Sequence, residues 1–256
     1  MKVVAVIPVR MGASRFPGKP LAHILGRPML EHVFRRTQTC ATLDDVLVAT
    51  CDQEIVKACA SFGATAVMTS DKHVRASDRV AEVAAGLDAD VIVMVQGDEP
   101  MILPEMIDLA LRPLIDDPRV VCSNLAAPIT SVEEFEDSNT IKIVIASNGD
   151  ALYFSREPIP ARAKVSFSEL GAMKQVCVIP FRREFLLDYS KLSPTPLEAI
   201  ESIDMLRALE HGFPIRLVRT DKVTHAVDTV QDIHIVEQLM RGDPLLAGYS
   251  PAEAIG

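Results

Sequence analysis

Two hydrophobic patterns alternate over the first hundred residues of the chain. Short, continuous apolar runs are typical of strands buried on both faces of a sheet, and longer stretches between them have apolar residues at helical spacing. The strands are predicted at about residues 3–9, 45–50, 64–68 and 90–95, and the helices at about 28–40, 52–62 and 77–87. This alternation predicts right-handed βαβ units on a parallel sheet that helices cover.

Beyond a helix at about 104–116 the pattern becomes rich in strands. Strands are predicted at about 119–128, 140–147, 151–155, 174–181 and 215–218, with a polar loop at about 161–172. Helices are predicted at about 196–211, ending at Gly212, and at 230–241. The sequence therefore predicts an α/β fold with a mixed sheet flanked by helices. We expect one domain over 1–245, with an inserted β-rich subregion at about 150–190 and a tail over 246–256.

Composition narrows the class of protein. A chain of 256 residues that is 48% hydrophobic can bury a substantial core. The net charge of −9 argues against general affinity for nucleic acid. The apolar runs are far shorter than the ~20 residues that span a bilayer, and Met1 and Lys2 lead directly into core sequence, so no membrane or targeting segment is expected. The five cysteines form an odd number without a C-x-x-C pair, which favours reduced thiols in the cytoplasm.

A basic loop follows the first predicted strand, at the sheet edge where α/β proteins bind ligands. Arg10, Arg15 and Lys19 are close enough in sequence to surround one triphosphate, and Gly12 and Gly18 allow the backbone to approach it. The loop matches neither the Walker A nor the G-x-G-x-x-G motif. A solvated loop with cations for solubility is the alternative; three cations directly after a buried strand favour phosphate binding.

Acidic residues occupy two comparable positions. Asp98 follows the strand at 90–95, so it lies at the same predicted edge as the basic loop and is a candidate ligand for Mg²⁺. A turn aspartate is the alternative interpretation. Asp228 precedes the last helix, where Thr229 and Asp232 have capping-box spacing. From the residues alone, an exposed loop acid is as good an interpretation of Asp228 as a metal ligand.

The segment 73–79 gives a weaker signal. Ser77 is predicted to be the N-cap of the following helix, while Arg75 and Arg79 are candidate anion contacts. The six histidines form no H-E-x-x-H arrangement, and no Ser/His/Asp set can be assembled.

Four motifs together resemble one enzyme family. These are Arg10 followed by S-R-F-P-G-K-P, then V-Q-G-D-E-P, A-L-Y-F-S-R and V-D-T-x-x-D, in order between about residues 3 and 240. They are similar to the 3-deoxy-manno-octulosonate cytidylyltransferases. The resemblance implies a domain of the nucleotide-diphospho-sugar-transferase type, a homodimer formed through the β-rich subregion, and Mg²⁺-dependent transfer of CMP from CTP to an acidic sugar with release of pyrophosphate.

The resemblance also implies roles for individual residues. The residues implied in phosphate binding and catalysis are Arg10, Lys19, Asp98 and Asp228, of which Asp98 and Asp228 would hold the metal. The nucleotide would contact Arg10, Ser14, Arg15, Lys19, Arg79 and Gln96. The acidic sugar would contact Arg75, Gln96, Tyr153, Arg156, Gln175, Glu201 and Asp204. The anomeric hydroxyl would attack the α-phosphorus in line, and the sequence identifies no general base for it.

The chain departs from the family pattern at positions that contact the sugar and the base. The family's H-[LV]-G-[IV]-Y-x-[YF] segment is replaced by residues 175–181, Q-V-C-V-I-P-F, and its S-G-T-[DE]-R run by R-A-S-D-R. Met11 and Ala13 stand where relatives have Tyr and Ser. Such changes can redirect the acceptor, because Gln175 cannot carry the charge of a histidine.

Other functions therefore stay open at this stage. The acceptor could be an 8-amino octulosonate, a nonulosonic acid or a phosphonate in place of 3-deoxy-manno-octulosonate, whose activation serves lipopolysaccharide or capsule assembly. A glycosyltransferase of the GT-A class should show D-x-D, where this chain has Gln96-Gly97-Asp98. A catalytically inactive nucleotide-binding relative is the non-enzymatic alternative, and pyrophosphate release with any acid sugar would exclude it.

Overall fold

The computed structural model describes residues 1–12, 16–162, 165–222 and 224–249. Within them, one five-stranded sheet has the order β11-β6-β1-β4-β5. Its strands are β1 (Val3–Pro8), β4 (Asp45–Thr50), β5 (Thr65–Met68), β6 (Val91–Val95) and β11 (Val178–Arg182). The first four run parallel, and β11 pairs antiparallel with β6. Parallel strands joined by helices are what the alternating pattern predicted.

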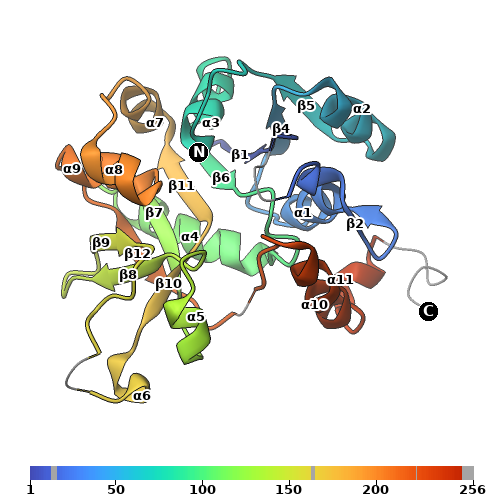
Figure 1. Cartoon of the computed structure of the whole chain (residues 1–256). Helices are drawn as coiled ribbons and strands as arrows, with labels where there is room; N and C mark the ends of the chain where they lie inside the picture. Colours follow the sequence, from blue (N-terminus) through green and yellow to red (C-terminus); the bar gives the residue numbers. More distant parts are fainter. Residues whose placement is uncertain (13–15, 163–164, 223, 250–256) are drawn as a thin grey trace.

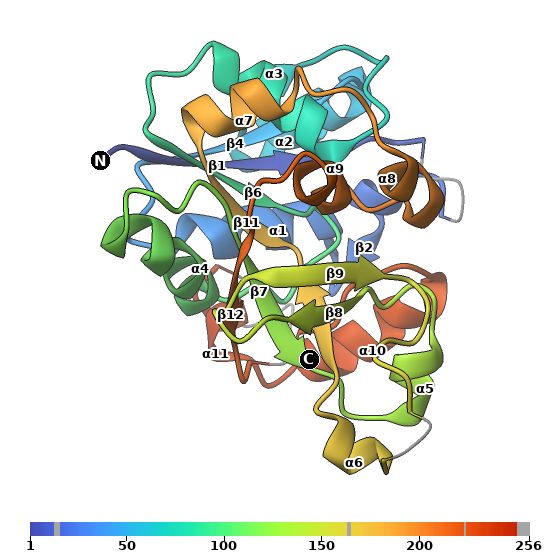
Figure 2. The same ribbon diagram turned by 90° about the vertical axis from the view of Figure 1, so that its left-hand side faces the viewer.

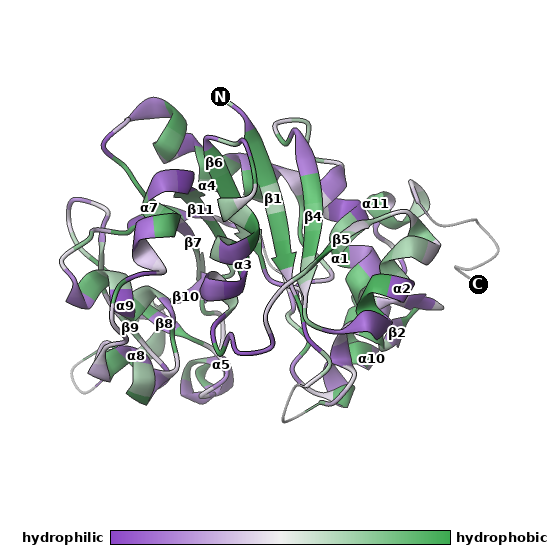
Figure 3. Ribbon diagram, turned by 90° about the horizontal axis from the view of Figure 1, so that it is seen from above, coloured by the Kyte–Doolittle hydropathy of each residue, from purple (hydrophilic) through white to green (hydrophobic). Residues whose placement is uncertain are grey.

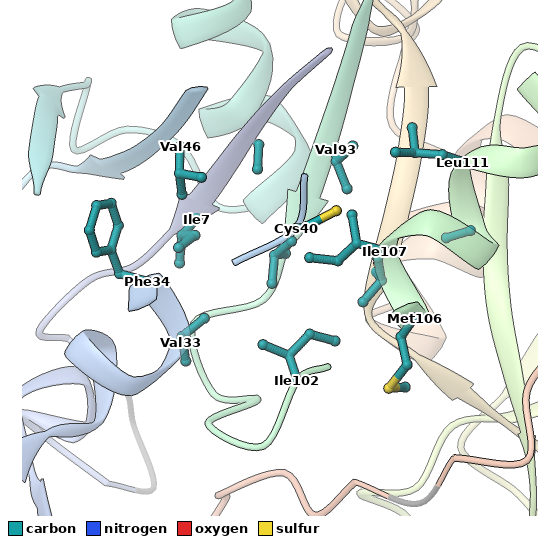
Figure 4. Packing of buried hydrophobic residues seen from close by; sticks show 14 of the residues in the cluster. Ile7, Val33, Phe34, Cys40, Val46, Val93, Ile102, Met106, Ile107 and Leu111 are labelled. Atoms are coloured by element: carbon teal, nitrogen blue, oxygen red, sulfur yellow. The ribbon is translucent and has the colours of Figure 1, made fainter. Parts of the chain in front are cut away.

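Helices cover both faces of this sheet. They are α1 (Met29–Gln38), α2 (Gln53–Phe62), α3 (Ala76–Ala85), α4 (Pro104–Asp116) and α7 (Arg183–Tyr189). Successive β1 residues point to opposite faces. Ile7 therefore packs with Val33 of α1 and Ile107 of α4 (Figure 4), whereas Val6 joins a cluster with Val80 of α3. Burial on both faces explains why β1 is apolar throughout, and Figure 3 shows the apolar residues gathered in β1 and β6.

A second sheet has the order β12-β7-β10-β8-β9. Its strands are β7 (Ser123–Pro128), β8 (Lys142–Ile145), β9 (Ala151–Ser155), β10 (Met173–Val176) and β12 (Arg216–Arg219). The short helices near it are α5 (Val132–Glu136), α6 (Phe167–Leu170), α8 (Pro196–Glu201) and α9 (Met205–Glu210). In Figures 1 and 2, α5 and α6 lie at the end of this sheet that is remote from the first sheet.

A third group of elements packs beside α1. It comprises η1 (Lys19–Leu21), the hairpin of β2 (His23–Ile24) and β3 (Arg27–Pro28), α10 (Val230–Met240) and α11 (Pro244–Ala247). Ile24, Met29, Val227, Val236 and Leu246 form its buried cluster. Because Val227 belongs to this cluster, the segment before α10 is held close to η1.

The expected fold class is confirmed, with three corrections in detail. The strand expected at 174–181 is two strands, because the chain leaves the second sheet after β10 and enters the first sheet at β11, with Cys177 between them. The helix expected at 196–211 is broken into α8 and α9 at Ser202, whose φ of 54° no helix continues through. The loop expected at 161–172 contains α6.

The predicted caps were right in one case and wrong in another. Thr229 and Asp232 form the capping box of α10. Ser77 is not the N-cap of α3, because that helix begins at Ala76 and its N-cap is Arg75. The Ser77 hydroxyl instead donates a hydrogen bond to Asp204. The expected division into one domain and a tail stays a prediction, and within the described residues no helix has the length and apolarity to cross a membrane.

Candidate functional site

The site begins where β1 and β6 end side by side. The loop after β6 approaches the loop after β1 so closely that a Cβ built on Gly97 would lie 2.1 Å from Val9 Cγ1 and 3.3 Å from Pro8 O. No side chain fits there. Gly97 therefore brings Asp98 and Gln96 against the segment that carries Arg10.

One cluster joins the basic and acidic motifs that the sequence analysis singled out. Gly18, with a φ of 75°, turns the chain into η1, and Lys19 Nζ donates to Asp98 Oδ2 and to Val227 O, both at 2.8 Å. The same ammonium lies 3.7 Å from Asp228 Oδ1. The Val227 amide donates to Asp98 O at 2.9 Å, which holds the two acidic loops together. Asp98 and Asp228, 130 positions apart in the sequence, thus face one cation.

These carboxylates fit a divalent cation that shares its coordination with a substrate. The described residues offer no convergence of three or more His, Cys, Asp or Glu side chains. Mg²⁺ in phosphate-transfer sites is bound by one or two carboxylates, with water and phosphate oxygens completing the octahedron. The position of the Lys19 ammonium between the two carboxylates indicates that their field favours a cation.

A cavity of about 210 Å³ opens beside this cluster. Arg10, Lys19, Arg75 and Arg79 contribute cationic side chains to its wall, and His73 lies on the same wall. Arg79 is buried and donates to the Thr69 hydroxyl and to Ser70 O, so its guanidinium is held in place. The wall is rich in positive charge, which suits a polyphosphate.

Arg75 is also held by acidic partners outside the cavity. Its Nε lies 3.3 Å from Glu198 Oε1 and 3.8 Å from Asp204 Oδ1, and Nη1 donates to the Ser202 hydroxyl at 2.8 Å. Part of its charge is therefore neutralised within the protein. Arg75, expected on the sugar side, lines the smaller cavity.

A larger cavity of about 750 Å³ lies between the two sheets. Gln175, Arg156, Asp204 and Asp228 line it, together with Lys174 from β10. The two cavities have Gln96 and Asp98 in common. A molecule in each would therefore meet at these two residues.

Gln175 presents its amide to the larger cavity in a defined orientation. The Asn124 amide nitrogen donates to Val176 O at 2.7 Å and to Leu125 O at 3.0 Å, so its oxygen is the acceptor for Gln175 Nε2. Gln175 Oε1 is then directed away from Asn124. The residue that replaces the family's histidine offers a neutral hydrogen-bonding group in a fixed position.

Tyr153 and Glu201 lie behind this cavity rather than in its described wall. Glu201 accepts hydrogen bonds from the Arg156 amide at 2.7 Å, the Ser155 hydroxyl at 2.9 Å and the Tyr153 hydroxyl at 3.3 Å. Arg156 Nε donates to Glu201 O at 2.7 Å. Glu201 thereby positions Arg156, which does line the cavity.

Asp204 is oriented by α3. Its Oδ2 accepts from the Ser77 hydroxyl at 2.7 Å and from the Ser77 amide at 3.1 Å. Burial raises the pKa of Asp204 above its usual value, although these hydrogen bonds and the charge of Arg75 act in the opposite direction. Beside it, Arg207 forms a buried ion pair with Glu198.

Sequence reasoning overlooked two groups in the larger cavity. Glu99 is buried, and desolvation, with the charge of Asp98 as the second cause, raises its pKa to about 7. His225 lies on the same wall and is bonded to Asp232. The position of His225 three residues before Asp228 was the only available signal for it. Ser14 and Arg15, expected to bind the nucleotide, lie outside the described residues.

Comparison with known proteins identifies the family. The model of the cytidylyltransferase family matches residues 4–223. The 3-deoxy-manno-octulosonate cytidylyltransferase of Syntrophotalea carbinolica is 43% identical over 94% of this chain and 100% of its own length. That of Geotalea daltonii is 45% identical over 93% of this chain and 98% of its own.

Solved structures agree in fold. A CMP:2-keto-3-deoxy-manno-octonic acid synthetase complexed with CTP superposes with a TM-score of 0.86 at 38% identity, covering 94% of this chain and 98% of its own. A 4-diphosphocytidyl-2C-methyl-D-erythritol synthase from Anaerococcus prevotii, at 14% identity and a TM-score of 0.64 over 94% and 99%, shares the fold alone. With the family model spanning most of the chain and relatives of this identity over nearly its whole length, the chain belongs to the 3-deoxy-manno-octulosonate cytidylyltransferase family.

Proposed function

We propose that this cytidylyltransferase transfers CMP from CTP to the anomeric hydroxyl of 3-deoxy-manno-octulosonate and releases pyrophosphate, with Mg²⁺ bound by Asp98 and Asp228. The observation that supports this most directly is the pair of cavities that meet at Gln96 and Asp98. A triphosphate-sized anion fits the cationic wall of one, and a sugar acid fits the larger one. The α-phosphorus would lie where they meet.

On the nucleotide side, the chain supplies charge in fixed positions. Arg10 and Lys19 border the smaller cavity, and Arg79 is held by Thr69 and Ser70. These cations would bind the phosphate oxygens and stabilise the charge that develops on the departing pyrophosphate. Arg15 and Ser14 belong to the same proposed set through the family motif.

Lys19 has to give up its present partners when the substrate binds. Its ammonium contacts both acidic loops, and a phosphate group would attract it away from Asp98. Asp98 and Asp228 would then be the protein ligands of the metal. The bound Mg²⁺ would supply positive charge to the phosphate oxygens during transfer.

On the acceptor side, Arg156 is the cation best placed for the sugar carboxylate. Glu201 and the carbonyls of Ser138 and Ser202 fix its guanidinium and backbone at the cavity wall. Gln175 and Gln96 offer amide groups for sugar hydroxyls. These contacts would orient the anomeric hydroxyl for in-line attack.

We also propose a homodimer that forms through the second sheet. Strand β9 is an edge of that sheet, and Leu152 on it is 62% exposed. An edge strand with an exposed apolar residue favours pairing with another chain. A single species of monomer mass in light scattering, at concentrations used for the enzyme assay, would contradict this proposal.

The five cysteines are all free thiols, which agrees with a reducing cytoplasm.

The decisive experiment is pyrophosphate release with CTP and Mg²⁺, using 3-deoxy-manno-octulosonate, its 8-amino analogue, a nonulosonic acid and no acceptor in parallel. We expect release with 3-deoxy-manno-octulosonate, because the chain keeps Arg10, Lys19, Asp98 and Asp228. No pyrophosphate release with this sugar, but release with another acid, would assign a different acceptor. No pyrophosphate release with any acid in the panel would refute the proposed activity.

Two variants connect the activity to the site. Lys19→Ala should raise the KM for CTP strongly, because it removes an ammonium that lines the smaller cavity. Lys222→Ala is the matched control, since that lysine is half exposed on the surface near Glu105. Equal kinetics for Lys19→Ala and the control would remove Lys19 from the phosphate site.

A further inference from the structure

One ionisable group in the larger cavity has no part in the mechanism above. His225 lies in the segment between β12 and α10, and its side chain is 36% exposed on the wall that also carries Asp98 and Asp228. Its Nε2 lies 3.0 Å from Asp232 Oδ1. A histidine oriented by a carboxylate and open to a substrate cavity is the arrangement of a general base.

The carboxylate of Asp232 is fixed before it meets the imidazole. Its Oδ2 accepts from the Thr229 amide at 2.7 Å, the Thr229 hydroxyl at 2.9 Å and the Asp228 amide at 3.0 Å. The bond from the Thr229 amide belongs to the capping box of α10, whose other bond runs from the Asp232 amide to the Thr229 hydroxyl, so the first turn of the helix holds the carboxylate in place. Oδ1 is the oxygen that remains for His225.

This arrangement selects one tautomer of the ring. Asp232 accepts all three of these hydrogen bonds through Oδ2, as an ionised carboxylate does. Such a carboxylate only accepts, so the neutral imidazole carries its proton on Nε2. Nδ1 then has the lone pair, and it makes no hydrogen bond within the described part of the chain.

The segment that carries His225 is tied to the acidic loop of the site. Thr224 is buried and its hydroxyl interacts with the Glu99 carboxylate, and Val227 N donates to Asp98 O. The imidazole is therefore held on the same side of the larger cavity as the two proposed metal ligands. That is the side at which an acceptor hydroxyl would approach the α-phosphorus.

We infer that His225 is the general base of the transfer, and the inference rests on the function proposed above. Nδ1 accepts the proton of the anomeric hydroxyl as the new oxygen–phosphorus bond forms. The bond between the α-phosphorus and the bridging oxygen breaks, and pyrophosphate leaves with that electron pair. The imidazolium that results is stabilised by Asp232 and returns its proton to water after product release.

The pH dependence of this step depends on the charged groups around the ring. The charged groups that line the cavity with His225 are Asp98, Glu99, Asp228, Asp232, Glu133, Glu134, Asp137, Arg156, Lys174 and Asp204. We expect activity to fall at acid pH, because a general base has to be unprotonated when the substrate binds.

The test compares His225→Gln with His234→Gln, whose histidine is exposed on α10 outside the cavity. Glutamine keeps a donor for Asp232 but has no base. We expect kcat to fall by about 10²-fold or more, with the KM values for CTP and sugar unchanged and the acidic limb of the kcat profile lost. The control should keep both kcat and the limb.

A second variant, Asp232→Asn, tests the positioning of the ring. The asparagine oxygen can still cap α10, while its NH₂ group faces Nε2 and forces the proton onto Nδ1. We expect a loss of kcat comparable to that of His225→Gln, and a double variant no worse than either, since residues that act as a unit are not additive. Nitrogen chemical shifts of the His225 ring in the metal-free protein should show the proton on Nε2 in the wild type and on Nδ1 in Asp232→Asn.

Three results would overturn the inference. One is an unchanged kcat with an unchanged acidic limb in His225→Gln, and another is a raised KM for the sugar with an unaltered kcat, which would make His225 a substrate contact. The third is a wild-type ring protonated on Nδ1. A wild-type enzyme that releases no pyrophosphate with any sugar acid would instead refute the proposed function.

Discussion

Acid should loosen the attachment of the C-terminal helix through a single buried histidine. His32 on α1 is fully buried, with Nε2 2.7 Å from Ile24 O and Nδ1 3.0 Å from the Tyr249 hydroxyl. The carbonyl of Ile24 can only accept, so Nε2 carries a proton, and Tyr249 donates to Nδ1 of the neutral ring. Tyr249 follows α11, and the same hydroxyl accepts from Arg36 Nε at 3.2 Å.

Burial, with the charges of Arg36 and Arg27 in addition, lowers the pKa of His32 from 6.5 to about 4. In the unfolded chain the ring takes up its proton at the ordinary value, so the unfolded state binds more protons between these two values. The contribution to the free energy of unfolding is complete above pH 6.5, decreases as the pH falls, and is lost near pH 4. The gap corresponds to about 3 kcal/mol in full, of which about 2 kcal/mol is lost by pH 5.

Urea denaturation at pH 8, 6.5 and 5 measures this loss. His32→Gln keeps a donor for Ile24 and an acceptor for Tyr249 but cannot be protonated. We expect the variant to be less stable than the wild type at pH 8 by about 1 kcal/mol and to lose about 2 kcal/mol less between pH 8 and 5. His234→Gln, at an exposed position, should follow the wild type. The same pH dependence in His32→Gln and wild type would refute this assignment of the buried ring.

Three further predictions concern the site. Gly97→Ala should reduce the free energy of unfolding by about 1–3 kcal/mol and impair turnover, because the added Cβ would overlap Val9. Thermal unfolding and pyrophosphate release measure the two effects. Gly242→Ala is the control that should change neither, since no described atom lies within 4 Å of a Cβ built there. Asp98→Asn and Asp228→Asn should each abolish turnover and weaken Mg²⁺ binding in calorimetry with the unfolding temperature preserved, so that full activity in either variant argues against the metal assignment. Gln175→His should change the KM for the sugar and leave that for CTP, since Gln175 lines only the larger of the two described cavities; an altered KM for CTP alone would contradict this placement.

Local patterns were sufficient for most of the first 116 residues. The strand at 45–50 and the helix at 104–116 have the bounds that were expected, because a continuous apolar run and a helical period are properties of neighbouring residues. The cap of α10 followed from Thr229 and Asp232 for the same reason. The motifs around Lys19, Asp98 and Asp228 identified the family, since each is a short run that can be read along the chain.

Contacts between distant segments decided the rest. Nothing in the run 174–181 shows that it leaves one sheet for another at Cys177, because no glycine or proline marks the change between Val176 and Val178 and only the partners of the two strands differ. Arg75 looked available for an anion until α8 placed Glu198 beside it.

By itself, then, the sequence determined the order of the elements, the loops that carry charge and the family. Only the tertiary structure decided which loops meet: that Lys19 lies between Asp98 and Asp228, and that His225 faces the larger cavity with Asp232 behind it. The physical reason is that a strand or helix forms from interactions between near neighbours, whereas a site forms from side chains that chain folding brings together across more than a hundred residues.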